Sequence, residues 1–283
     1  MKQRRRRREP VPAPVERRTP YALARVVADP ARPSRRTLLL DGHEAGEVDL
    51  REPRALGFGY MRRIADVLDA LAPPGRALDA VHVGGGAFAL PRYLEATRPR
   101  SRQDVLELDP EVVRLARERL GLRPSPRLRV RIGDAAELLP RRPERSADVV
   151  IGDAFDGPDV PAALATPEFA AQVRRVLRPA GVYVLNVIDA PPLDAVRAHA
   201  GTLSGAFGSV AAIGPPGVLR SRAPGNVVLV ASDAPLPLAA LARAAQAAVP
   251  REQVVAASAL GVRARRGTSA SAACRAWSAP ASA

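Results

Sequence analysis

The stretch Leu78–Pro110, "LDAVHVGGGAFALPRYLEATRPRSRQDVLELDP", decides the fold of this chain. It contains an apolar run, three consecutive glycines, a segment with helical spacing and a second apolar run that carries Glu107. Strand, glycine turn, helix and strand in this order form one unit of a parallel sheet. Glycines at such a turn leave N–H groups free at a helix N-terminus and let a ligand approach the backbone. We therefore predict that Gly84, Gly85 and Gly86 bind a cofactor; the alternative is a tight turn without a ligand.

The same alternation continues on the C-terminal side of this stretch. Asp109 and Thr166 stand where helix caps are expected, with Pro110 and Pro167 at the first helical positions, and Pro179 with Gly181 predicts the end of the second helix. The pattern predicts an α/β fold with a doubly wound, Rossmann-like, mostly parallel sheet. The short apolar segments expected as strands are 77–83, 104–108, 128–132, 147–153, 181–188, 207–214 and 225–233, with a helix over 238–249.

Four regions are expected along the 283 residues. Residues 1–19 read as a basic disordered arm, and 20–72 as a small N-terminal β region, with a turn at Asp41–Gly42, plus a helix. Residues 73–250 form the Rossmann-like nucleoside-binding catalytic domain, and 251–283 read as a low-complexity tail.

The formal net charge of +14 is concentrated at the N-terminus, where Arg4 to Arg8 form an unbroken run. Such a run can bind nucleic acid through phosphate contacts. A solvated, disordered arm is the favoured interpretation, because no aromatic residue is interleaved for base stacking. Prolines follow the arginines where an export signal needs an apolar stretch, and no apolar run reaches the ~18 residues of a membrane span. We expect a cytoplasmic protein without membrane contact.

Metal sites and disulfides are not expected. Cys274 is the single cysteine, and His43, His82 and His199 are scattered without the spacing of metal ligands.

Acidic residues at the predicted strand ends indicate a nucleoside cofactor. Glu107, 23 positions after Gly84, stands where this fold places a carboxylate that accepts from ribose hydroxyls. Asp134 ends the next strand and can accept from the amino group of adenine; an equally weighted alternative is that it caps the helix beginning at Ala135. A dinucleotide is disfavoured, because a GxGxxG motif requires glycine at position 89, which is Ala89.

The loop after the fourth strand carries the expected chemistry. Asp153 and Asp156 in "GDAFDGPDVP" face the same crevice, and paired carboxylates can hold an ammonium ion or take its proton once it is desolvated. The alternative is an Asp-rich turn ahead of Gly157. The functional interpretation is favoured for Asp153 and evenly balanced for Asp156.

These motifs together resemble the spermidine synthase (polyamine aminopropyltransferase) family, over about residues 37–189. The similar segments are "LLLDGHEAGEVDL", "FGYMRRIA", "VGGGAFALPRYL", "LELDPEVV", "IGDA" and "GDAFDGP". The resemblance implies a class I methyltransferase-type sheet that binds S-adenosyl compounds through Gly84–Gly86, Glu107, Asp134 and Ala135.

The resemblance also implies an activity. Decarboxylated S-adenosylmethionine would donate an aminopropyl group to a polyamine-type amine, Asp153 would deprotonate and orient this amine with help from Tyr60, and Asp156 would hold the substrate. Members of the family commonly associate as dimers, so the resemblance leaves a homodimer possible here, and the sequence does not test it.

Three positions depart from the family pattern. Ala87 stands in place of an aspartate, and Ala45 and Met61 stand in place of glutamines, so polar contacts to the amines are absent. Two alternatives therefore stay open: a methyltransferase dependent on S-adenosylmethionine, and a degenerate, non-catalytic nucleoside-binding protein. His82 is a candidate partner for a methionine carboxylate, although a packed core histidine is the favoured interpretation.

Overall fold

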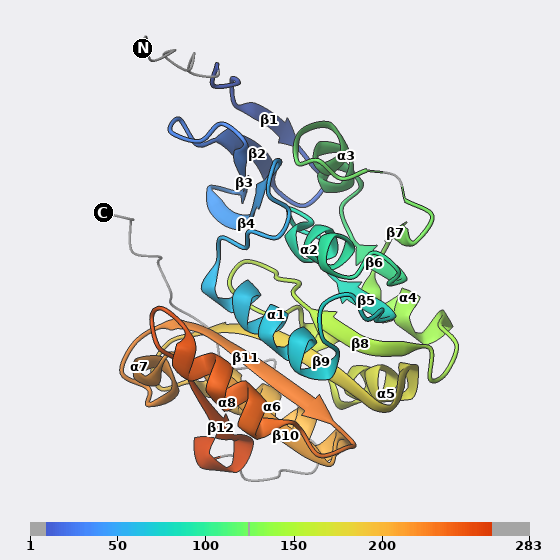
Figure 1. Ribbon diagram of the computed structural model, residues 1–283, viewed down its shortest axis with the longest axis vertical. Coiled ribbons are helices and arrows are strands. Elements are labelled where there is room, and N and C mark those ends of the chain that lie inside the picture. The colour runs from blue at the N-terminus through green and yellow to red at the C-terminus, as the bar shows by residue number, and fades with distance from the viewer. Residues whose placement is uncertain (1–9, 124, 262–283) are drawn as a thin grey trace, which may run out of the picture.

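The computed structural model describes residues 10–123 and 125–261 (Figure 1). Within them, eight strands form one sheet in the order β12-β10-β11-β9-β8-β5-β6-β7. The strands β5 to β9 pair in parallel, whereas β11, β10 and β12 are added in antiparallel fashion at one edge. The strands of this sheet are β5 (Ala80–Val83), β6 (Gln103–Glu107), β7 (Leu128–Ile132), β8 (Ala147–Gly152), β9 (Leu177–Asp189), β10 (Ser209–Gly214), β11 (Gly225–Ser232) and β12 (Gln253–Ala256).

The position of the crevice follows from the strand order. The chain moves outward from β5 to β6 and β7, then crosses back to β8 on the other side of β5. In sheets of this kind, ligands bind beyond the carboxyl ends of the strands where the order reverses. Here that point lies between β5, which runs into the glycine turn, and β8, which runs into Asp153.

Helices cover both faces of the sheet (Figure 1). Because side chains alternate along a strand, Val182 and Val184 of β9 pack into one core, whereas Tyr183 and Leu185 pack into the other. The first core includes side chains of α1, α2, α3 and α8, and the second includes side chains of α4, α5 and α6. The helices are α1 (Gly59–Leu71), α2 (Ala89–Thr97), α3 (Pro110–Arg119), α4 (Ala135–Leu138), α5 (Pro167–Val176), α6 (Asp194–Ala206), α7 (Pro216–Leu219) and α8 (Leu238–Ala247), with 3₁₀ turns at Leu139–Arg141, Ala162–Leu164 and Ala257–Leu260.

A separate four-stranded antiparallel sheet precedes α1 and packs its buried face into the first core. Its strands are β1 (Val15–Arg18), β2 (Leu23–Ala28), β3 (Arg35–Leu40) and β4 (His43–Asp49). Asp41 and Gly42 form the predicted turn between β3 and β4, both with positive φ angles of 48° and 85°. A Cβ added to Gly46 in β4 would lie 2.7 Å from the Cβ of Ala87, so this hairpin lies directly against the glycine turn.

The expected α/β class, the mostly parallel sheet and the small N-terminal β region are confirmed. The predicted caps are also present: the Asp109 side chain accepts from the N–H groups of Glu111 and Val112, and Thr166 accepts from Phe169. These caps satisfy N–H groups that a helix cannot bond internally.

Three boundaries differ from the expectation. The segment 1–19 is not entirely a disordered arm, because Val15–Arg18 pair with β2 and Arg17 forms ion pairs with Glu111 and Glu118 of α3. The tail expected from 251 includes β12, which pairs with β10, so the sheet extends further than predicted. The run Arg4–Arg8 and the tail residues 262–283 lie outside the described residues.

The third difference concerns the end of α5. Pro179 and Gly181 were expected to end this helix, but it already ends at Val176 and the chain enters β9 at Leu177. An irregular register between β8 and β9, next to the pair Ala147 and Leu177, accommodates the extra residues.

Candidate functional site

The glycine turn and the end of β8 lie in direct contact. Gly84 has a φ of 91°, and a Cβ placed on it would lie 2.4 Å from the carbonyl oxygen of Asp153. No side chain fits this space, and the positive φ is costly for other residues. Glycine at this position therefore holds the turn beside the aspartate.

Glu107 fixes the shape of the turn. Its Oε2 accepts from the N–H groups of Gly85 at 2.7 Å and Gly86 at 3.4 Å, and its Oε1 accepts from the N–H of Asp109 at 2.9 Å. Burial raises the pKa of this carboxyl, and the three N–H donors oppose that shift. The structure thus places Glu107 at the predicted strand end, with a role in the turn that sequence reasoning did not identify.

Asp134 lies at the end of β7 and caps α4, where its side chain accepts from the N–H of Ala136 at 2.8 Å. The capping alternative is therefore observed. A contact between Asp134 and adenine stays a prediction, and a capping carboxylate can still accept through its other oxygen. Ala135, the first residue of α4, is buried.

Two exposed apolar side chains near these acids were missed in the sequence. Leu108 is 44% exposed and directly follows Glu107, while Ile132 is 53% exposed and stands opposite Glu107 in the strand register. Large apolar side chains at neighbouring strand ends can contact a flat, weakly polar ring. The signal in the sequence was an apolar residue at the last position of each expected strand, 104–108 and 128–132.

Asp153 lies at the centre of a hydrogen-bonded cluster. The hydroxyl of Tyr60, in the first turn of α1, donates to Oδ2 at 3.1 Å, and Nδ2 of Asn186 in β9 donates to Oδ1 at 2.9 Å. Burial raises the pKa of Asp153 to about 6, against the opposing effect of the two donors. Burial and the Asp153 charge raise the pKa of Tyr60 well above its usual value, so the phenol stays protonated.

A second amide extends this cluster. Nδ2 of Asn226 in β11 donates to Oδ1 of Asn186 at 3.0 Å, which leaves Nδ2 of Asn186 directed at Asp153. Sequence reasoning missed both asparagines. Asn186 interrupts the apolar segment "VYVLNVI", where a buried amide requires partners, and Asn226 directly precedes the apolar run "VVLV".

A small cavity opens between the glycine turn, α1 and Asp153. Three of its lining residues are Ala45, Met61 and Ala87, the positions at which the sequence departs from the family pattern. The residues that line it are Ala45, Met61, His82, Gly84, Gly85, Gly86, Ala87, Ala89, Leu90, Pro91, Ile151 and Asp153.

The remaining predicted residues lie outside this cluster or in the core. Asp156 is exposed on the loop after β8, and its backbone pairs with that of Asp159. His82 is buried, and its Nε2 forms a hydrogen bond at 2.9 Å with Oε1 of Gln103, as expected for a packed core histidine. Burial lowers the pKa of His82 to about 4, so it is neutral near pH 7.

No group of His, Cys, Asp and Glu side chains suited to a metal ion was found among residues 10–123 and 125–261. In the same residues, no helix combines the length and apolar character needed to cross a membrane.

Comparison with known proteins relates this site to one family. Residues 58–194 match the family model for the spermine/spermidine synthase domain, and this range includes Tyr60, the glycine turn, Asp153 and Asn186. A solved structure of a probable spermidine synthase from Corynebacterium glutamicum superimposes with a TM-score of 0.81 at 29% identity, covering 95% of this chain and 100% of that one.

Two curated relatives represent two kinds of activity. A polyamine aminopropyltransferase from Vibrio vulnificus is 31% identical over 144 residues, 50% of this chain and 47% of that protein. An eEF1A lysine and N-terminal methyltransferase from Bos taurus is 31% identical over 122 residues, 40% of this chain and 17% of that protein. The chain therefore spans about half of the first relative, and much less of the second.

Proposed function

Because residues 58–194 match the family model for the spermine/spermidine synthase domain, we propose that this protein is an aminopropyltransferase-like enzyme. It transfers an aminopropyl group from decarboxylated S-adenosylmethionine to an amine. The observation that carries the proposal is the hydrogen-bonded group of Tyr60, Asp153 and Asn186 beside the glycine turn.

The nucleoside part of the donor fits the strand ends of β5, β6 and β7. The glycine turn allows close approach of the ligand, Glu107 and Asp134 supply acceptors for ribose and adenine, and the exposed side chains of Leu108 and Ile132 offer apolar contact. The proposed nucleoside contacts come from three neighbouring strands, β5, β6 and β7. The carboxyl ends of these parallel strands lie side by side, so one ligand can contact all three.

Asp153 serves as the proton acceptor in this proposal. With a pKa of about 6 it is ionised near pH 7, and in the free enzyme its charge is held by Tyr60 and Asn186. An ammonium substrate gives one proton to the carboxylate and becomes a neutral amine. The amine lone pair then forms a C–N bond to the carbon next to the sulfonium, the C–S electrons return to sulfur, and neutral methylthioadenosine leaves.

The test is the release of methylthioadenosine from decarboxylated S-adenosylmethionine in the presence of a panel of amines. Amine-dependent release that Asp153→Asn abolishes, with donor binding retained, supports the proposal. Donor binding without any release, for the wild type and all amines, supports the alternative of a non-catalytic nucleoside-binding protein.

A second candidate is methyl transfer from S-adenosylmethionine. One observation favours it: the chain is also 31% identical over 122 residues to an eEF1A lysine and N-terminal methyltransferase. Release of S-adenosylhomocysteine from S-adenosylmethionine, with none of methylthioadenosine from the decarboxylated donor, would select this candidate.

A further inference from the structure

We propose that Glu252 is a positioning residue, which holds the first turn of α1 so that the hydroxyl of Tyr60 reaches Asp153. This inference rests on the proposed function in one respect, since that function makes Asp153 the proton acceptor. It goes beyond that function because Glu252 lies in the segment that was expected to be a low-complexity tail, outside the range 58–194 that matches the family model.

A buried ion pair joins the last part of the sheet to α1. Nε of Arg63 in α1 lies 3.2 Å from Oε2 of Glu252, and both side chains are only 8% exposed. Glu252 stands between α8 and β12, and its N–H donates to the carbonyl oxygen of Ala245 at 2.9 Å. Separation of a buried pair leaves a charge without its partner, which is strongly disfavoured. The pair therefore ties α1 to the connection between α8 and β12.

The same carboxylate lies beside the start of α1. A Cβ placed on Gly59, the first residue of this helix, would lie 4.0 Å from Oε1 of Glu252. The N-cap residue Phe58 forms no side-chain hydrogen bond with the helix, and the first turn contains no acidic residue. A negative charge stabilises the positive end of a helix dipole. Glu252 thus supplies, from a distant segment, the charge that the local sequence lacks.

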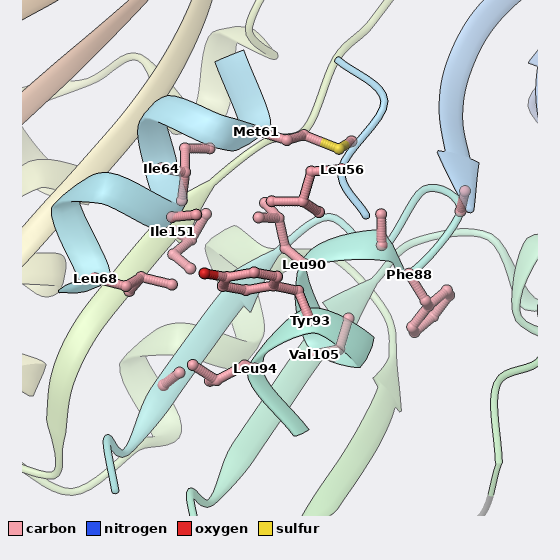
Figure 2. Close-up of a cluster of buried hydrophobic side chains, with 14 of the residues drawn as sticks. Leu56, Met61, Ile64, Leu68, Phe88, Leu90, Tyr93, Leu94, Val105 and Ile151 are labelled. Carbon is pink, nitrogen blue, oxygen red and sulfur yellow. The ribbon is translucent and has the colours of Figure 1, made fainter. Parts of the chain in front are cut away.

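The apolar face of α1 holds the helix in a less specific way. Figure 2 shows Met61, Ile64 and Leu68 of α1 in a cluster of buried apolar side chains. Hydrophobic burial is non-directional, so it keeps α1 against the sheet but specifies the rotation of the helix less sharply than a buried charge pair does.

The ion pair and the tyrosine lie on the same side of the helix. Tyr60 and Arg63 are three residues apart, a spacing that makes side chains neighbours on a helix surface. The hydroxyl of Tyr60 donates to Oδ2 of Asp153 at 3.1 Å, which is already at the long end of the range of about 2.5 to 3.0 Å for an O–H···O hydrogen bond. A small displacement of the first turn therefore weakens this bond.

The experiment is an NMR titration of the Asp153 carboxyl in the full chain, with the change Glu252→Gln. Two effects of this change have opposite signs: the lost negative charge by itself lowers the pKa of Asp153, whereas a lost hydrogen bond from Tyr60 raises it. We expect the midpoint to rise by at least about 0.5 units, part of the shift of about 1 to 2 units that corresponds to complete loss of a hydrogen bond to a charged group.

The Tyr60→Phe background separates positioning from a general structural role. No hydroxyl is left to be displaced in this background, so Glu252→Gln should leave the midpoint unchanged or lower it. Glu118→Gln removes a carboxylate that lies 3.2 Å from Arg17, and as the matched control it should leave the midpoint unchanged in both backgrounds. A rise of equal size with and without the hydroxyl would overturn the inference.

A second variant keeps the net charge constant. Glu252→Gln removes one of the two carboxylates that pair with the buried Arg63, the other being Asp66, and this loss can prevent folding. Arg63→Lys is therefore made in parallel, with circular dichroism as the check of folding. One ammonium cannot replace Nε beside Glu252 and Nη1 beside Asp66 at once, so the midpoint should rise here too. An unchanged or lower midpoint in either folded variant overturns the inference.

The midpoint is measured on the free enzyme, without donor or amine. Failure of methylthioadenosine to bind, or absence of its release from the donor, would refute the proposed function and leave the midpoints unaffected. The two failures are thus distinguishable.

Discussion

The hydrogen bond from Tyr60 to Asp153 should set the pH range in which the carboxylate is ionised. The change Tyr60→Phe removes only the hydroxyl that donates to Oδ2 at 3.1 Å. A hydrogen bond to a charged group contributes about 1.5 to 3 kcal/mol, which at 1.36 kcal/mol per pKa unit corresponds to about 1 to 2 units. A lost donor disfavours the ionised form, so the pKa of Asp153 should rise from about 6 to about 7 or 8.

At pH 7 the ionised fraction would then fall from about nine-tenths to between about a half and a tenth. The assay is an NMR titration of ¹³C-labelled aspartate carboxyls, with Asp153→Asn to assign the signal. Tyr21→Phe, at an exposed tyrosine of the N-terminal sheet region, is the control and should leave the midpoint unchanged. A wild-type midpoint near 4, or no upward shift in Tyr60→Phe, would refute the reasoning.

Three further changes test other parts of the site. Asp153→Asn should abolish turnover and keep nucleoside binding. Folding raises the pKa of Asp153 from 3.8 to about 6, so this group lowers the stability of the wild type as the pH rises from about 4 to about 6. The variant lacks the group, so its free energy of unfolding in urea should increase relative to the wild type between pH 4 and pH 8. Gly84→Ala should lower the free energy of unfolding by at least ~2 kcal/mol more than Gly157→Ala does. Both glycines have a positive φ, but only a Cβ on Gly84 would meet a carbonyl oxygen, at 2.4 Å. Equal losses of stability in the two variants would contradict this contact. Glu107→Gln should weaken methylthioadenosine binding by ~10-fold in calorimetry, the order expected for the loss of a charge-assisted hydrogen bond. Glu137→Gln, at an exposed glutamate of α4, is the control and should leave the affinity unchanged. An unchanged affinity in Glu107→Gln would argue against a contact between Glu107 and the ribose.

The central sheet could be predicted from the sequence because its signals are local. Apolar runs as long as buried strands, Pro110 after Asp109 and Pro167 after Thr166 each constrain a few neighbouring residues, and the structure follows them closely. The boundaries that differ depend on contacts between distant segments. β1 is held by pairing with β2 and by the ion pairs of Arg17 with α3, and neither leaves a local pattern.

The candidate site divides in the same way. Glycines and acids at strand ends can be located because the topology of a parallel sheet brings strand ends together. The amides of Asn186 and Asn226 depend on the register between β9 and β11, and the apolar cavity depends on how α1 and the β3–β4 hairpin meet the glycine turn. The spacing of residues along the chain predicts neither this strand register nor this packing. The roles of Glu107, Asp134, Asp153 and Asp156 toward a ligand stay predictions.

The most direct test of aminopropyl transfer is a paired calorimetric titration with decarboxylated S-adenosylmethionine and with S-adenosylmethionine. The two ligands differ by one carboxylate, the feature that separates the two candidate reactions. Tighter binding of the decarboxylated ligand is the result that the proposed function predicts. Tighter binding of S-adenosylmethionine, or binding of neither ligand, would contradict it.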